Sequence, residues 1–305
     1  MTGAEGPVTC GPRRCLMVEA RPNVHRRRFG SVMRTLRRNA DLSMEEAAKL
    51  LGIGKPALSK IENGKQRVHG LGLTAFFSVY GVESEETRRK VKAMAALSAS
   101  GKRTNLLDEY QDAIQTDAFE DYLHLEGMAV KADVFFTQVI PGLLQTKAYA
   151  TSIVERSQVW PSKREVDRFV DLRLARQAIL SRKNPLSLWC ILDEAALRRT
   201  VGGPEVMREQ LEALLEATEG RPHVGIQVLP FEAGAHAGID GAFQLLGFEV
   251  GSPVAVVETK TTGLYLEEDV DVSRYRSAFD DLRTQALDRQ GTRRYIQNLI
   301  KDIET

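Results

Sequence analysis

Several residue types and patterns that would place the protein in a particular class are scarce or missing. Its 305 residues include three cysteines, Cys10, Cys15 and Cys190, an odd and widely spaced set that suits neither a disulfide framework nor a zinc site. Such cysteine usage is expected of a protein in the reducing cytoplasm. The sequence has no stretch of about 18 consecutive apolar residues, so we expect no transmembrane helix. The five histidines show no metal-ligand spacing, and neither a metal nor a cofactor is predicted.

The first 23 residues lack the apolar core of a secretory signal. They are rich in glycine, proline and arginine, and this composition predicts a disordered tail over 1–23. Met1 and Met17 are alternative natural starts.

The near-neutrality of the whole chain hides an uneven distribution of charge. The net charge is +1, but residues 1–104 carry 20 Lys and Arg against 9 Asp and Glu, which gives +11. Residues 105–305 carry 22 against 32, which gives −10. A basic part joined to an acidic part predicts that one of them meets a polyanion and the other does not. We therefore expect two domains, 24–104 and 105–305, to follow the tail.

The basic region reads as a mainly α domain of five helices. Apolar spacing predicts helices over about 27–39, 44–52, 55–63, 71–80 and 84–99. Ser43 and Glu46 have the spacing of a capping box at the start of the second helix. Gly64 is a natural C-terminal stop for the third helix.

The third predicted helix has two faces of different character. Its inner face consists of Ala57, Leu58 and Ile61. Its outer face carries Lys55, Pro56, Ser59 and Lys60. A helix of about nine residues is not stable alone, so it depends on docking of the inner face. Docking would present the outer face rigidly, as a reader of a DNA groove requires.

The segment LSMEEAAKLLGIGKPALSKIENG, residues 42–64, resembles the helix-turn-helix domain of the XRE family, which includes the phage repressors. The match has no insertion. The resemblance implies that the third helix enters the major groove of double-stranded DNA. It implies base contacts for Lys55, Pro56 and Lys60 and a phosphate contact for Ser59. Lysine can donate to the O6 and N7 atoms of guanine.

Two further positions of the motif matter. Arg37 and Glu62 match a structural ion pair of the family between the first and third helices. Many members carry glutamine at the start of the second helix, where its side chain touches a phosphate. This sequence has Met44 there, so that phosphate contact is not expected.

Other basic residues flank the motif and are expected to neutralise phosphates: Arg26, Arg27, Arg28, Lys65 and Arg67. Such contacts strengthen binding and its salt dependence without specifying sequence. For each of these residues a merely solvated charge is the alternative. A basic helical domain that binds a protein is the alternative for the whole region.

The acidic region mixes helical patterns with short strands. Helical patterns occur over about 105–128, 142–157, 163–182, 193–199, 204–218 and 270–303. Strand patterns occur over 186–192, 223–230, 242–250 and 253–259. We expect an α+β domain with a small, mostly antiparallel sheet.

The segments IPGLLQTKAYA, LDEAALRRTVGG, IQVLPFEAGAHAGIDGAF and VVETK resemble a domain of unknown function that follows the helix-turn-helix in many actinobacterial regulators. That family includes antitoxin-like regulators of development and antibiotic production. The resemblance covers about residues 120–295. It implies a small partner protein encoded nearby.

The acidic region shows no constellation typical of an enzyme, and none is predicted. Asp193 and Glu194 follow a strand and are expected to cap the next helix. A looser polar set occurs near the strand ends: His236, Asp240, Glu258 and Lys260. It contains no legible pair of nucleophile and base.

Three polar or aromatic residues of the acidic region have two interpretations each. In PGLLQT, residues 141–146, Gln145 is expected to be a buried structural anchor, with a ligand contact as the alternative. Trp160 and Trp189 are expected in the core, with a pocket lining as the alternative.

Together these patterns predict a cytoplasmic, sequence-specific DNA-binding transcription regulator. Its C-terminal domain would dimerise and receive a signal from a protein or an unidentified small-molecule effector. The homodimer is expected because helix-turn-helix proteins join two half-sites about one helical turn apart. The alternative is an antitoxin-like module that mainly sequesters a small partner protein, with DNA binding secondary.

Overall fold

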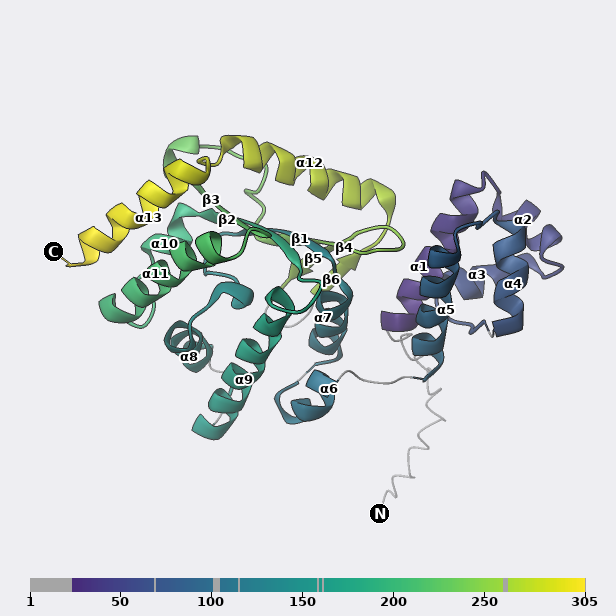
Figure 1. Ribbon diagram of the computed structural model, residues 1–305, viewed down its shortest axis with the longest axis horizontal. Coiled ribbons are helices and arrows are strands. Elements are labelled where there is room, and N and C mark those ends of the chain that lie inside the picture. The colour runs from purple at the N-terminus through teal and green to yellow at the C-terminus, as the bar shows by residue number, and fades with distance from the viewer. Residues whose placement is uncertain are drawn as a thin grey trace, which may run out of the picture.

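The computed structural model describes residues 24–68, 70–100, 105–114, 116–157, 159–160, 162–259 and 263–304 (Figure 1). The predicted tail, with Cys10, Cys15 and Met17, and the predicted domain boundary at 101–104 lie outside the described residues. Figure 1 shows a helical N-terminal part beside a larger C-terminal part built on a sheet.

The N-terminal part runs through α1 (Val24–Asn39), α2 (Met44–Leu50), α3 (Lys55–Glu62), α4 (Gly70–Val79) and α5 (Glu85–Ser100). Local sequence sets the ends of these helices. The Ser43 hydroxyl accepts from the N–H of Glu46, and the Glu46 carboxylate accepts from the N–H of Ser43, so the predicted capping box starts α2. The hydroxyl of Ser84 accepts from the N–H of Thr87 at the start of α5.

These helices share one hydrophobic core. Its members include Phe29, Met33, Leu58, Phe76, Phe77 and Val91. Because α2 and α3 each have fewer than ten residues, they are too short to be stable in isolation, and burial of Ala47, Ala48, Leu58 and Ile61 in this core holds them.

The sheet of the C-terminal part is mixed. Its strands are β1 (Lys131–Phe136), β2 (Ser187–Asp193), β3 (Val224–Leu229), β4 (Phe243–Gly247), β5 (Val254–Glu258) and β6 (Gly263–Leu266). They lie in the order β3-β2-β1-β4-β5-β6. β1 pairs parallel with β2 and β2 with β3, whereas β1–β4, β4–β5 and β5–β6 are antiparallel.

This topology corrects the expectation of a small, mostly antiparallel sheet. β1 was not predicted as a strand, yet it lies in the middle of the sheet and is buried on both faces. Its parallel pairing with β2 requires a long crossover, which the chain supplies between residues 136 and 187.

Helices cover both faces of the sheet. They are α6 (Asn105–Glu109), α7 (Asp117–Met128), α8 (Lys147–Arg156), α9 (Lys163–Ala175), α10 (Glu194–Arg198), α11 (Pro204–Gly220), α12 (Asp269–Gln285) and α13 (Arg289–Glu304). The predicted helix over 105–128 is divided at residues 110–116, and the one over 270–303 at residues 286–288.

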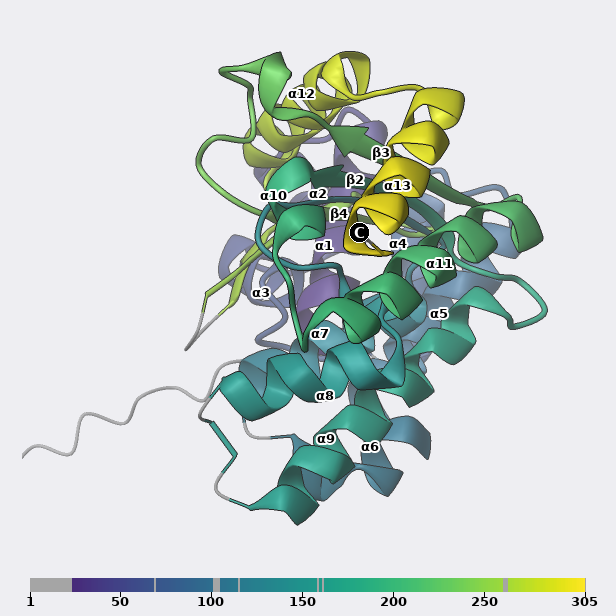
Figure 2. The same cartoon turned by 90° about the vertical axis from the view of Figure 1, so that its left-hand side faces the viewer.

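Alternation along the strands divides the C-terminal core into two layers. On one face, residues such as Val134, Cys190 and Ile226 pack with α7, α9, α11 and α13. On the other face, Phe135 and Ile191 pack with α12. Figures 1 and 2 show α12 on one side of the sheet and α7, α8 and α9 on the other.

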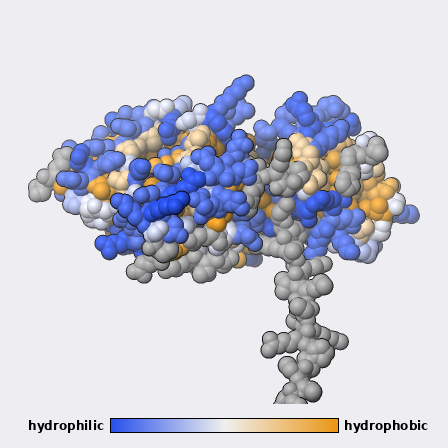
Figure 3. Space-filling view, turned by 90° about the horizontal axis from the view of Figure 1, so that it is seen from below, coloured by the Kyte–Doolittle hydropathy of each residue, from blue (hydrophilic) through white to orange (hydrophobic). Residues whose placement is uncertain are grey.

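The face of the molecule seen in Figure 3 is mostly hydrophilic, with hydrophobic residues in separate small groups. Among the helices that the structure describes, none combines the length and apolar character needed to cross a bilayer.

Candidate nucleic-acid interface

Helix α3 is defined by local signals at both ends. Gly54 is the N-cap in an extended conformation, and Pro56 lies in the first turn, where a missing N–H leaves no hydrogen bond unmade. Asn63 is the C-cap, and Gly64 follows with a φ of 70°, a value that favours glycine. A Cβ at Gly64 would also lie 2.8 Å from backbone atoms of Arg26.

A second glycine lets α3 approach α1 closely. A Cβ at Gly30 would lie 2.5 Å from the carbonyl oxygen of Glu62 and 2.7 Å from that of Ile61. Real Cβ atoms do not approach backbone oxygens this closely, so the crossing of the two helices requires glycine at this position.

An ion pair reinforces the same crossing. Arg37 Nε lies 2.7 Å from Glu62 Oε1, and Arg37 Nη2 lies 3.1 Å from Glu62 Oε2. Both residues are buried, and hydrogen bonding to Glu62 raises the pKa of Arg37. Arg37 Nη1 also donates to the carbonyl of Leu42 at 2.7 Å. This bidentate geometry orients α3 relative to α1 and leaves neither charge for DNA.

The outer face of α3 is open to solvent. Lys55, Pro56 and Lys60 are exposed, and Ser59 is partly exposed. Lys55 Nζ lies 2.6 Å from Glu45 Oε1 on α2, and both side chains remain more than half exposed. An exposed pair of this kind contributes little free energy, so it does not hold Lys55 firmly. Met44, the first residue of α2, is partly buried.

The loop after α3 presents two more basic side chains. Lys65 and Arg67 are exposed beside the C-terminal end of α3. The N–H of Lys65 donates to the carbonyl of Lys60 at 2.8 Å, which ties this loop to the helix.

The structure corrects the predicted phosphate role of Arg28, and it gives Arg26 and Arg27, which are partly exposed, contacts within the protein. Arg28 is 1% exposed, and its guanidinium donates to the carbonyls of Ser252 and Val250 at 2.5 and 3.0 Å. Arg27 Nη2 lies 2.6 Å from Asp121 Oδ2 on α7. Arg26 Nε donates to the carbonyl of Ser98 on α5 at 3.4 Å. These contacts direct all three guanidinium groups toward other parts of the protein.

Helix α1 therefore joins the two parts of the chain. The Arg28 guanidinium lies 3.9 Å from the centre of the Phe248 ring, next to the turn that connects β4 and β5. In Figure 1, α1 and α5 lie between the C-terminal part and helices α2, α3 and α4. The outer face of α3 thus remains open while the opposite side of the domain is docked.

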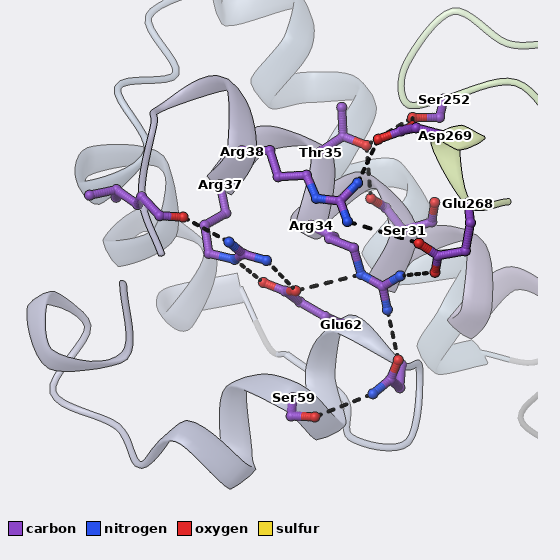
Figure 4. A network of polar contacts seen from close by, with 12 residues as sticks. Ser31, Arg34, Thr35, Arg37, Arg38, Ser59, Glu62, Ser252, Glu268 and Asp269 are labelled. Carbon is purple, nitrogen blue, oxygen red and sulfur yellow. Dashed lines mark hydrogen bonds and ion pairs between the residues drawn. The ribbon is translucent and has the colours of Figure 1, made fainter. Parts of the chain in front are cut away.

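A chain of polar contacts crosses this junction (Figure 4). Arg34 Nη1 lies 2.6 Å from Glu268 Oε1, and Arg34 Nη2 donates to Asn63 Oδ1 at 2.7 Å. Asn63 Nδ2 donates to the Ser59 hydroxyl on α3 at 3.3 Å. Arg38 forms a parallel contact with Asp269 at 2.5 Å. The residues before α12 are thereby linked to α3.

The polar residues considered for catalysis in the C-terminal part have structural contacts. Asp193 caps α10, since its Oδ1 accepts from the N–H of Ala195 at 2.8 Å. Glu194 is buried and accepts from the N–H of Phe231 at 2.9 Å. His236 Nε2 lies 4.0 Å from Asp193 Oδ2, and Asp240 is exposed. Lys260 lies outside the described residues.

The remaining candidates, Gln145 and Glu258, lie on one partly open cavity between the sheet and α7 and α9. Gln145 is 4% exposed and donates to the carbonyl of Ile140 at 2.6 Å. Trp160 lines a second hollow beside this cavity. Trp189 lies outside both; its ring nitrogen donates to Gln227 at 2.9 Å.

Sequence reasoning missed a cluster of charges that line this cavity, formed by Glu126, Arg173 and Arg176. Glu126 and Arg176 are buried, and Arg173 is partly exposed. A signal was present, because Arg173 and Arg176 continue the helical spacing of the apolar residues Phe169 and Val170. Charges on the apolar stripe of a helix must find buried partners or a cavity. Within the described ranges, no group of three or more His, Cys, Asp or Glu side chains is placed to hold a metal ion.

Comparison with known protein families agrees with this division of the chain. Residues 28–90 match a helix-turn-helix domain, a module that indicates DNA binding and transcription regulation. Residues 119–298 match a domain described as a domain of unknown function, DUF5753. Comparisons with curated proteins and with solved structures found no match. Because the second match covers more than half of the 305 residues, the chain belongs to the DUF5753 family, with a helix-turn-helix domain at its N-terminal side.

Proposed function

We propose that the protein is a sequence-specific DNA-binding transcription regulator of the XRE type, in which α3 reads the major groove. The observation that carries this proposal is the outer face of α3. Lys55, Pro56 and Lys60 are exposed there. On the opposite side, the close crossing at Gly30 and the ion pair of Arg37 and Glu62 hold α3 against α1. A rigid helix with exposed donors is what direct readout of base edges requires.

Phosphate contacts are assigned to Ser59, Lys65 and Arg67, which surround the C-terminal half of α3. The arginines of α1 take no part in this set, because they bind the C-terminal part and α5. The resulting interface is smaller than the +11 charge of the N-terminal region implies. Part of that charge serves to dock the acidic C-terminal region.

The C-terminal domain is proposed to receive a signal from a protein or a small molecule and to bring two chains together. A homodimer would place two α3 helices on half-sites about one helical turn apart. Sedimentation of the protein, free and on DNA, measures this directly. A single chain per particle in both states would remove the dimer from the proposal.

The DNA proposal is tested by selecting binding duplexes from a random pool and titrating them by fluorescence anisotropy. Lys60→Ala is expected to lose about 1–3 kcal/mol on a selected duplex and much less on its scrambled version. Lys65→Ala is expected to weaken both alike and to lower the slope of log K against log salt by about 0.9. Lys163→Ala, an exposed lysine on α9, is the matched control.

The alternative, a module that mainly holds a small partner protein, makes a different prediction for the same material. It expects no enriched duplex, and it expects a small protein in stoichiometric amount when the chain is isolated from its native cytosol. Equal losses on selected and scrambled duplexes for Lys60→Ala would show that α3 does not read bases.

A further inference from the structure

The cavity beside Gln145 and Glu258 lies under the sheet, between the strands and helices α7 and α9. Its volume is about 200 Å³. Ala132, Val134, Leu188 and Leu246 line it from three neighbouring strands, and Phe119 contributes an aromatic wall. An apolar floor of this kind suits the body of a small organic molecule.

The cavity adjoins a more open hollow. Phe119, Arg173 and Glu258 line both spaces. The second hollow has a volume of about 540 Å³, and Trp160 and Phe169 stand in its wall. Small-molecule sites commonly have volumes of about 300–1,000 Å³, so the outer hollow alone falls in that range. The two spaces therefore adjoin at these three side chains.

One pair of charges in the cavity is already satisfied. Arg176 Nε lies 2.9 Å from Glu126 Oε2, and Arg176 Nη2 lies 2.8 Å from Glu126 Oε1. The Tyr122 hydroxyl is 2.7 Å from Glu126 Oε1 and 3.0 Å from Gln244 Oε1. This bidentate pair neutralises itself and leaves no charge for a ligand.

Arg173 is different, because part of its guanidinium has no acceptor. Its Nη1 donates to Gln145 Oε1 at 2.9 Å, but its Nε is shielded from solvent and has no hydrogen-bond partner. Burial, together with the adjacent Arg176 cation, lowers the pKa of Arg173 to about 10. A buried donor without an acceptor costs free energy that a ligand oxygen would recover.

Glu258 does not supply the missing acceptor. Its Oε2 accepts from Gln244 Nε2 at 3.0 Å, and among the described residues no ion pair joins it to Arg173. The side chain of Glu258 reaches solvent at the end of β5, but desolvation at the cavity wall raises the pKa of its carboxyl group. In the protonated form it would not repel an anion that binds to Arg173.

The walls of the cavity also hold the DNA-binding domain. Helix α7 presents Phe119 and Glu126 to the cavity, and from the same helix Asp121 pairs with Arg27 on α1. Strands β4 and β5 present Gln244 and Glu258, and the turn between these strands binds Arg28. A molecule that reorders the cavity therefore acts on both elements that dock α1.

Resting on the proposed role of the C-terminal domain as a signal receiver, we propose that this cavity binds a small organic acid and that its occupancy changes the affinity for DNA. The carboxylate of the acid would accept from Arg173, since a planar guanidinium matches a planar carboxylate. The apolar body would lie against Ala132 and Leu246 and extend past Phe119 toward the outer hollow.

The test uses the full chain and a panel of monocarboxylates: butyrate, hexanoate, octanoate, phenylacetate and indole-3-acetate. Each is added to about 10 mM, and the shift in melting temperature is recorded because a ligand of the folded state stabilises it by mass action. The matched neutral probes are hexanamide, phenylacetamide and indole-3-acetamide. At least one acid is expected to raise the melting temperature while its amide does not.

Variants assign the effect to the cavity. Arg173→Met is expected to weaken binding of that acid by about ten-fold or more. Ala132→Leu fills the apolar floor without removing a charge, so it tests the site if Arg173→Met does not fold. Glu258→Gln is expected to keep or tighten binding, and Arg164→Met, an exposed arginine on α9, to leave it unchanged.

Three results would overturn the site: no shift with any acid of the panel, equal shifts with acid and amide, or full binding by both Arg173→Met and Ala132→Leu. Binding to a selected duplex is measured in the same samples. An acid that binds without changing the affinity for DNA overturns the coupling. Absence of DNA binding by the unliganded protein would instead refute the proposed function, and the acid site would be judged by the melting data alone.

Discussion

Replacement of Arg28 by methionine is expected to loosen the DNA-binding domain from the rest of the protein. Arg28 is almost completely buried in the junction, at 1% exposure. Its side chain makes two hydrogen bonds to backbone carbonyls and lies on the Phe248 ring. Methionine fills a similar volume but offers none of these polar contacts.

The magnitude follows from opposing contributions. Burial lowers the pKa of Arg28 to about 10, so confining the cation costs about 3 kcal/mol at about 1.4 kcal/mol for each pKa unit. Two hydrogen bonds from a charged donor contribute about 1.5–3 kcal/mol each, and a desolvated cation–π contact about 2 kcal/mol. The net contribution is therefore about 2–5 kcal/mol. Because methionine keeps part of the packing against the Phe248 ring, we expect Arg28→Met to cost about 2–4 kcal/mol, slightly less than the full net contribution.

Arg38→Met is the matched control at the same junction. Arg38 pairs with Asp269 at 2.5 Å, but both side chains are about half exposed. Exposed pairs contribute about 0–1 kcal/mol, so this variant should cost less than about 1 kcal/mol.

Urea unfolding with two probes measures the difference. Both tryptophans, Trp160 and Trp189, lie in the C-terminal part, so their fluorescence follows that part alone. Far-ultraviolet circular dichroism also follows the helices of the N-terminal part. Arg28→Met should shift the circular dichroism transition to lower urea by about 1–2 M at an m-value of about 2 kcal/mol/M, ahead of the fluorescence transition. A shift no larger than that of Arg38→Met would refute the reasoning.

Three other perturbations test separate features. Gly30→Ala forces α1 away from α3 and should cost about 1–3 kcal/mol in thermal unfolding, whereas Gly127→Ala, where a Cβ meets no neighbour, should be neutral or stabilising. Glu45→Gln removes the ion-pair partner of Lys55 and a negative charge beside the proposed DNA interface, so the affinity for a selected duplex should rise a few-fold. An unchanged affinity would show that Lys55 is not part of that interface. Burial lowers the pKa of His25 from 6.5 to about 4. As the pH falls below about 6.5, the unfolded state therefore takes up a proton that the folded state does not yet bind. The stability that His25 contributes is complete above about pH 6.5 and declines toward pH 4, by at most about 3 kcal/mol. His25→Leu should flatten that decline, and an unchanged slope would assign it to other groups.

Signals that act over a few residues were sufficient to predict where the helices of the helix-turn-helix region begin and end. The capping box of Ser43 and Glu46, the proline in the first turn of α3 and the glycine after it depend on hydrogen bonds and backbone sterics within one turn. For the same reason strands β2, β3, β4 and β5 were predicted close to their observed bounds, because the apolar pattern of each is local.

Strand β1 shows where local pattern fails. Its sequence KADVFF is flanked by helical patterns, and it includes the charged residue Asp133. Only its pairing with β2 and β4 makes it the centre of the sheet. The parallel pairs β1–β2 and β2–β3 join segments that lie far apart in the chain, so the expectation of a mostly antiparallel sheet was not met there.

The arginines at the start of α1 were misassigned for a related reason. In sequence, RRRFG reads as a solvated basic run near a DNA-binding motif. The partners of Arg28 lie more than 220 residues away, and that of Arg27 lies 94 residues away. The residues next to these arginines in the sequence give no information about partners so far along the chain.

The sequence by itself determined that a helix-turn-helix precedes an acidic α+β domain, because caps, turns and apolar periods act between neighbours in the chain. Tertiary structure alone decided which of its charges stay exposed around α3, which join the two domains and which surround the cavity with Arg173. The fate of a charge depends on its solvation and on its partners, and folding brings those partners together from distant segments.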